Sequence, residues 1–151
     1  METGTTEPRL STYLHARACR NGTPLVGNFE LTARCNFNCK MCYVHLTAEE
    51  QQRRGRELTA DQWLAIAEQA RSRGMLFLLL TGGEPLIRKD FRYLLTELKK
   101  MGLLVSVNSN GSLIDRDWLD FFRHEPPFRF NITLYGGSEE TCLLYTSPSP
   151  R

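Results

Sequence analysis

The sequence predicts an α/β fold built around a sheet of parallel strands. Short apolar runs alternate along the chain with helical patterns, and the helical patterns carry recognisable start and stop signals. The run over residues 75–80 is apolar throughout, as expected for a strand whose two faces are both covered. The resulting order βαβαβαβ predicts parallel strands joined by right-handed crossovers.

Three helices are expected between these strands. The first begins after Thr59, where Thr59 and Gln62 form a capping-box pattern, ends at Gly74, and has an apolar face made of Trp63, Ile66, Ala67 and Ala70. The second spans about residues 89–101 and buries Phe91, Leu94, Leu95 and Leu98. The third is short, is capped by Asp115, ends before Pro126-Pro127, and carries Trp118, Phe121 and Phe122.

The strands are expected over residues 29–32, 75–80, 103–107 and 128–134. Residues 1–28 form a lead segment, with a short helix before Asn21-Gly22 that closes the amino-terminal side of the sheet. The polar stretch 45–57 is expected to be a solvated connector, with a helix or a mobile lid as the alternatives, and Ser138 looks like the cap of a further helix.

Composition limits the classes of function. Of the 151 residues, 41% are hydrophobic and 24% are charged, and the formal net charge of +2 is too small to indicate a nucleic-acid partner or a membrane surface. No stretch is long and apolar enough to span a bilayer. Residues 1–9 do not resemble a secretory signal, so we expect a cytoplasmic protein.

Three of the five cysteines, Cys35, Cys39 and Cys42, lie within eight residues. Closely spaced thiols without a secretory signal indicate a metal site more often than disulfides. In a four-iron cluster, three thiolates leave one iron without a protein ligand, and an open metal position is where a substrate binds. A zinc site with His45 as fourth ligand and buried unligated cysteines are the alternatives. Cys19 stands alone and is interpreted as a small buried residue.

A second polar motif, Thr81-Gly82-Gly83-Glu84-Pro85, directly follows the second expected strand. Its glycines allow close approach to the backbone, and Glu84 offers an acceptor for an ammonium group. Because the carboxyl ends of parallel strands meet at one sheet edge, four loops should lie together there, over residues 34–43, 81–86, 108–112 and 135–137. The third of these contains the polar turn Asn108-Ser109-Asn110-Gly111.

The CxxxCxxC spacing of the cysteines, together with the Gly-Gly-Glu motif about forty residues later, resembles the radical S-adenosylmethionine (SAM) superfamily. The resemblance implies a partial (β/α)6 barrel of parallel strands, truncated after about four strands. It also implies a [4Fe–4S] cluster on Cys35, Cys39 and Cys42, and SAM whose amino group is seated by Gly82, Gly83 and Glu84, with Pro85 next to them. Such enzymes cleave SAM reductively to a 5′-deoxyadenosyl radical that abstracts hydrogen from the substrate.

Weaker likenesses add further residues. The turn at Asn108 and Ser109 resembles the SNG turn of the superfamily. Residues 132–136 resemble its ISLDG strand end; Thr133 keeps the hydroxyl expected near the SAM ribose, whereas Tyr135 replaces the acid. The motifs also resemble members that carry a C-terminal SPASM-type domain and modify peptides or proteins, with an external electron donor. A cofactor-biosynthesis enzyme is the nearer alternative, and a non-enzymatic zinc-binding module is the more distant one. The catalytic residues toward the substrate stay unassigned.

The last ten residues differ in character from the rest. Residues 142–151 read CLLYTSPSPR, and their Ser-Pro-Ser-Pro pattern cannot continue the helix that Ser138 would begin. The string resembles the in-frame translation of a transposase sequencing adapter. We therefore expect a partial radical SAM domain over residues 29–141, followed by a non-native tail over residues 142–151, so that the chain is a fragment.

Overall fold

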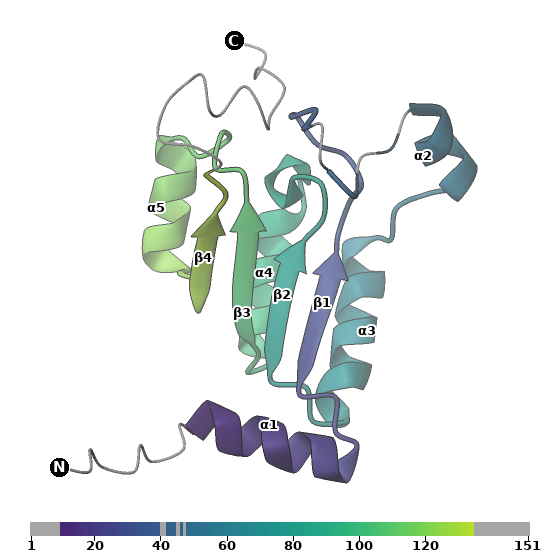
Figure 1. Cartoon of the computed structure of the whole chain (residues 1–151). Coiled ribbons are helices and arrows are strands. Elements are labelled where there is room, and N and C mark those ends of the chain that lie inside the picture. The colour runs from purple at the N-terminus through teal and green to yellow at the C-terminus, as the bar shows by residue number, and fades with distance from the viewer. Residues whose placement is uncertain (1–9, 40–41, 45, 47, 135–151) are drawn as a thin grey trace, which may run out of the picture.

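The computed structural model describes residues 10–39, 42–44, 46 and 48–134, whose arrangement is shown in Figure 1. In chain order the elements are α1 (Leu10–Asn21), β1 (Val26–Glu30), α2 (Ala48–Arg54), α3 (Ala60–Ser72), β2 (Phe77–Thr81), the 3-10 helix η1 (Pro85–Ile87), α4 (Phe91–Lys100), β3 (Leu104–Ser109), α5 (Arg116–His124) and β4 (Arg129–Ile132). This order confirms the predicted alternation of strands and helices.

The four strands form one parallel sheet in the order β1-β2-β3-β4. Each strand therefore lies next to the strand that precedes it in the chain, as in the wall of a (β/α) barrel. One register row crosses the whole sheet and pairs Phe29 with Leu80, Leu80 with Val107, and Val107 with Phe130. The predicted α/β class and the parallel sheet are confirmed.

The helices α3, α4 and α5 cover the face of the sheet to which this row points. Trp63 of α3 packs on Phe29 with ring centroids 4.8 Å apart, and Phe122 of α5 packs on Phe130 at 5.0 Å. The α4 side chains in the same core are those predicted from the sequence, and each of them is fully buried: Phe91, Leu94, Leu95 and Leu98. Burial of this apolar face is the main source of stability.

The other face of the sheet carries polar groups. Its middle register row pairs Asn28 with Leu79, Leu79 with Ser106, and Ser106 with Arg129. At the amino-terminal edge, α1 lies across the strand ends (Figure 1), and His15 stacks on Phe77 with ring centroids 6.3 Å apart. The helix predicted before Asn21-Gly22 is thus confirmed, and it closes that edge.

The helix starts follow the local chemistry of the sequence. Thr59 caps α3 through the complete capping box with Gln62, and the Asp115 side chain caps α5 by accepting from Trp118 N. Asp90 occupies the cap position of α4, but its side chain makes no capping hydrogen bond there. Its carboxylate has a different partner, described below.

Several expectations were wrong in detail. The first strand lies over Val26–Glu30 and not over residues 29–32, because residues 31–34 leave the ladder to follow the loop after β2. Part of the stretch 45–57 forms α2, whose acidic first turn and basic last turn complement the helix dipole. Cys19 is exposed, because α1 turns the adjacent Ala18 inward. Ile66, expected on the apolar face of α3, is 39% exposed.

The buried register row yields a stability prediction. Leu80 is fully buried, and Leu80→Ala should lower the free energy of unfolding by about 2–5 kcal/mol through lost burial and a cavity. The matched control is Leu119→Ala, since Leu119 is 49% exposed and should cost less than about 1 kcal/mol. Denaturant unfolding of both variants measures the difference, and equal losses would contradict this description of the core.

Candidate functional site

Two loops leave β1 and β2 at the carboxyl edge of the sheet and continue to pair after the strands have ended. Leu31 N donates to Thr81 O at 2.9 Å, and Gly83 N donates to Thr32 O at 2.7 Å. Glu84 N then donates to Arg34 O at 2.8 Å. The segment that leads into Cys35 therefore lies directly against the Gly-Gly-Glu loop, as the shared sheet edge predicted.

The two glycines make this close approach sterically feasible. A Cβ atom on Gly82 would lie 2.3 Å from Thr32 O, and one on Gly83 would lie 2.2 Å from Arg34 O. Gly82 also has φ +141°, a conformation that side chains disfavour. The glycines are needed here because the backbone that carries the cysteines occupies the space beside them.

Glu84 joins this pair of loops to a third loop, the one that follows β3. Its side chain is fully buried. Oε1 accepts from Leu86 N and Ser109 Oγ, each at 3.0 Å, and Oε2 accepts from Asn110 N at 2.8 Å. Among the described residues, no Lys or Arg forms an ion pair with this carboxylate.

The third loop reaches back to the cysteine loop through Asn110. Its Nδ2 donates to Asn36 Oδ1 at 2.9 Å and lies 3.8 Å from Cys35 Sγ. Asn36 Nδ2 in turn donates to Ser112 Oγ at 2.8 Å. The loops after β1, β2 and β3 are therefore linked into one hydrogen-bonded unit.

The three motif cysteines lie along the first of these loops. Cys42 N donates to Cys39 O at 3.1 Å, and Phe37 N donates to Cys35 Sγ at 3.3 Å. Burial is the main cause that raises the pKa of Cys35 and of Cys39 above the usual thiol value. The pKa of Cys39 is raised further by the neighbouring Cys35 and Cys42, so the three thiols influence one another electrostatically.

Comparison with known proteins identifies the family. Residues 29–149 match the family described as the Radical SAM superfamily. The chain belongs to the radical SAM superfamily. The match covers all three loops and confirms the resemblance seen in the sequence.

Two radical SAM relatives indicate the range of proteins to which the chain is similar. The chain is 29% identical over 116 residues to a protein named probable GTP 3',8-cyclase from Pyrobaculum aerophilum, with 77% of this chain and 36% of that protein covered. It is 33% identical over 91 residues to PqqA peptide cyclase from Granulibacter bethesdensis, with 60% and 24% covered. The chain thus spans about a third or less of these relatives.

Solved structures support the radical SAM fold. SuiB of Streptococcus suis bound to the precursor peptide SuiA superposes with a TM-score of 0.71 at 18% identity, over 99% of this chain and 36% of SuiB. SuiB bound to S-adenosylmethionine gives a TM-score of 0.68 at the same identity, over 99% and 34%. The expected partial barrel is consistent with this likeness.

The radical SAM superfamily uses a [4Fe–4S] cluster and SAM, and the described donor set fits a cluster. Within the described part of the chain, no three or more Cys, His, Asp or Glu side chains gather closely enough to hold a metal ion. His45, the proposed fourth zinc ligand, lies outside the described residues.

The remaining residues predicted to bind SAM lie around the same radical SAM loops. Pro85 is buried at the start of η1. Asn108 Oδ1 accepts from Asn131 Nδ2 at 2.8 Å, and buried Ser109 joins β3 to Glu84. Thr133 N donates to Ser109 O at 3.1 Å, so Thr133 lies beside this edge. Their contacts with SAM stay predictions, and residues 135–137 and Ser138 lie outside the described residues, as does the expected boundary at residue 141.

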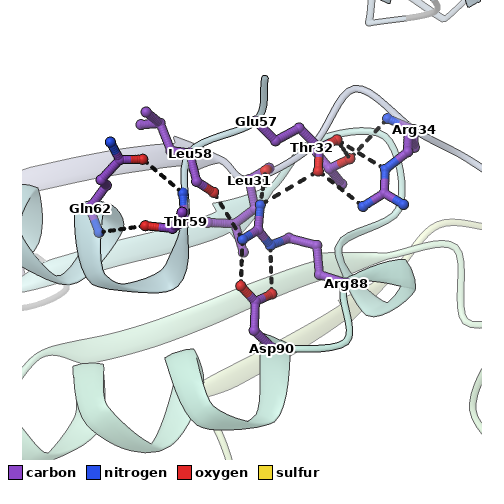
Figure 2. Close-up of polar contacts among 9 residues, drawn as sticks. All are labelled: Leu31, Thr32, Arg34, Glu57, Leu58, Thr59, Gln62, Arg88 and Asp90. Carbon is purple, nitrogen blue, oxygen red and sulfur yellow. Dashed lines mark hydrogen bonds and ion pairs between the residues drawn. The ribbon is translucent and has the colours of Figure 1, made fainter. Parts of the chain in front are cut away.

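A network of ion pairs around the buried Arg88, shown in Figure 2, lies next to the cysteine loop. Arg88 is 6% exposed, and its Nε and Nη2 donate to the two carboxylate oxygens of Asp90 at 2.9 and 2.7 Å. Nη1 donates to Leu31 O at 2.8 Å, and Nη2 donates to Leu58 O at 3.0 Å. The guanidinium therefore contacts three separate segments of the chain.

Glu57 extends the network toward the cysteines. Its carboxylate lies 3.7 Å from Arg88 Nη1 and accepts from Arg34 Nε and Nη2, each at 3.0 Å (Figure 2). It also accepts from Thr32 Oγ1, whose oxygen accepts from Arg34 N at 3.0 Å. The residue immediately before Cys35 is thus held by its side chain and by its backbone.

The acids of this network have lowered pKa values. The hydrogen bonds from Arg88 are the main cause that holds the pKa of Asp90 below its usual range. Burial alone would raise the pKa of Glu57, but hydrogen bonds from Arg34 and Thr32 and the charges of Arg34 and Arg88 lower it overall. Both carboxylates are therefore ionised at neutral pH.

Sequence reasoning missed the ion network and the cross-loop role of Asn110. Arg88, Glu57 and Arg34 are common surface residue types, and their partners lie up to 57 positions away in the chain. No local periodicity marks such pairs. The one local signal was the separation of only two positions between Arg88 and Asp90, which have opposite charges.

The lowered pKa of Asp90 makes a pH-dependent prediction. A carboxyl group with a lowered folded-state pKa stabilises the fold above its unfolded pKa of about 4, and this contribution is lost as the pH falls through the folded value. Asp90→Asn should therefore lower the free energy of unfolding at pH 7 by about 1–3 kcal/mol. Denaturant unfolding between pH 7 and 3 should show the variant and the parent protein converging at low pH, and a gap independent of pH would contradict the ionic role.

Proposed function

We propose that this chain is the cluster- and SAM-binding part of a radical SAM enzyme that modifies a peptide or protein. The observation that carries the proposal is the direct hydrogen bonding of the cysteine loop to the Gly-Gly-Glu loop and to the turn after β3. These contacts bring the proposed cluster ligands and the proposed SAM seat to one edge of the sheet. Family membership supports the same activity.

In this proposal, Cys35, Cys39 and Cys42 ligate three irons of the cluster, and the fourth iron stays open for SAM. When bound together, the cluster and SAM supply a 5′-deoxyadenosyl radical by reductive cleavage, with the electron from an external donor. Gly82, Gly83 and Glu84 seat the amino group of SAM, next to Pro85. Asn108, Ser109 and Thr133 border the nucleoside side of the seat.

The electrostatics of Glu84 support its assignment to SAM. A buried carboxylate is costly unless it is compensated, and the partners of Glu84 among the described residues are neutral donors. SAM carries an ammonium and a sulfonium group, so a cation bound near this edge would be stabilised by the uncompensated charge.

Two observations favour a peptide substrate. One relative is named a PqqA peptide cyclase, and SuiB, whose fold this chain shares, has been solved with a precursor peptide. The open face of the sheet also presents amide and charged groups suited to a peptide backbone, including Asn28, Glu30, Arg129 and Asn131. A SPASM-type domain elsewhere in the full-length protein belongs to this proposal.

A cofactor-biosynthesis activity is the second candidate. It is favoured by the similarity to the protein named probable GTP 3',8-cyclase, which covers more of this chain than the similarity to the peptide cyclase does. Product analysis separates the two candidates, since only the second would convert a free nucleotide.

The cluster assignment predicts distinct outcomes for two cysteines. In the full-length protein, reconstituted without oxygen, Cys39→Ala should abolish the cluster, because three thiolates are needed to hold it. Cys19→Ala is the matched control and should leave iron and sulfide content unchanged, since Cys19 is exposed on α1. Iron, sulfide and zinc analysis reads the result; bound zinc without sulfide in the parent protein would overturn the proposed function.

The Glu84 assignment predicts a selective loss of SAM affinity. Glu84→Gln removes the charge and nearly keeps the volume of the side chain, while its amide nitrogen replaces one of the two accepting oxygens. Cluster content should persist while SAM binds roughly tenfold more weakly. Glu68→Gln is the control, because it removes the same charge from an exposed pair on α3, away from the site. Calorimetric titration of the reconstituted proteins with SAM measures both, and unchanged affinity in Glu84→Gln would remove Glu84 from the SAM seat.

A further inference from the structure

Arg88 lies between η1 and α4, at the end of the loop that follows β2, and its contacts converge on the ends of the cysteine loop. One contact, Leu31 O, lies four residues before Cys35, and another, Leu58 O, lies after α2. The stretch between these two carbonyl groups contains all three motif cysteines. A single buried guanidinium therefore ties together the two ends of the segment that carries the cysteines.

Glu57 joins the two ends of the same segment directly. Glu57 lies at the returning end of the stretch and binds Arg34 and Thr32 at its starting end. Figure 2 shows these side chains side by side, with Arg88 beneath both. The two ends are thus joined directly to each other as well as through Arg88.

The free-energy cost of an unpaired buried guanidinium favours keeping all these contacts of Arg88. A buried guanidinium is destabilising unless its N–H groups are paired, and Arg88 finds its partners in Asp90, two backbone carbonyl groups and Glu57. If either end of the cysteine segment moved away, a carbonyl partner would be lost and a buried donor left unpaired. The carboxylate of Asp90 binds Arg88 and makes no capping hydrogen bond to α4.

From these contacts we propose that Arg88 is a positioning residue for the [4Fe–4S] site: it fixes the separation of the two ends of the cysteine segment and thereby holds Cys35, Cys39 and Cys42 in register for one cluster. The inference rests on the proposed function, since it assumes that these cysteines ligate a cluster. In this role Arg88 does not bind the cysteines or the substrate directly. It acts through Leu31, Leu58 and Glu57.

The test separates positioning from general stability. In the reconstituted full-length protein, Arg88→Lys keeps the positive charge but cannot bind two carbonyl groups and a carboxylate in a fixed plane. We expect it to release iron to a chelator about tenfold faster than the parent protein at a temperature well below unfolding. Leu98→Ala is the matched control, because it weakens the buried face of α4 without touching the cysteine segment.

The outcomes are distinct. Faster release in Arg88→Lys but not in an equally destabilised Leu98→Ala supports positioning, whereas release that follows the melting temperature in both variants overturns it. If Arg88→Lys does not fold, Asp90→Asn decides by the same assay, because it removes the carboxylate that orients the Arg88 guanidinium. Release at the parent rate in Asp90→Asn would overturn the proposal. A parent protein without iron and sulfide would instead refute the proposed function.

Arg71→Ala serves as a surface control, because it breaks only the exposed pair with Glu68. It should change neither the iron-release rate nor the melting temperature.

Discussion

The site depends on the continuation of β1 and β2 pairing beyond the ends of the strands. Backbone hydrogen bonds from Leu31, Gly83 and Glu84 hold the entry to the cysteine loop against the Gly-Gly-Glu loop. Any side chain at Gly82 or Gly83 would collide with the backbone of the other loop. The sheet therefore determines where the two motifs meet, and the glycines allow them to meet this closely.

Two buried charged residues, Arg88 and Glu84, lie on either side of these hydrogen bonds, and they differ in the partners that surround them. Arg88 is surrounded by acceptors and two carboxylates, so its charge is fully compensated within the described residues. Among the described residues, the donors to Glu84 are all neutral. This asymmetry is physically informative, because compensated charge stabilises a shape whereas uncompensated charge attracts a ligand. Arg88 is therefore suited to hold the ends of the cysteine segment together, and Glu84 is suited to bind a ligand.

The sequence was sufficient for the element order, the parallel sheet, the buried face of α4 and the meeting of the motifs, because each depends on local periodicity or on the shared edge of parallel strands. It was insufficient for the bounds of β1, since the residues after Glu30 leave the ladder through tertiary contacts with a loop fifty positions away. The exposure of Cys19 depends on how α1 docks. The sequence did not predict the Arg88 network for the same reason, because all its contacts except the Arg88–Asp90 pair join residues far apart in the chain.

The sheet separates cofactor binding from substrate recognition. The first is assigned to the edge that carries the loops, and the second is assigned to the open face. Residues that serve the cofactors are joined to one another across the edge, so their geometry is determined by backbone pairing and buried polar contacts. The side chains of Asn28 and Arg129 lie on the open face, away from the register row that packs against the helices. Changes there would alter what the open face recognises without disturbing the edge. A scaffold of this kind can keep one radical chemistry while its relatives act on substrates as different as a nucleotide and a peptide.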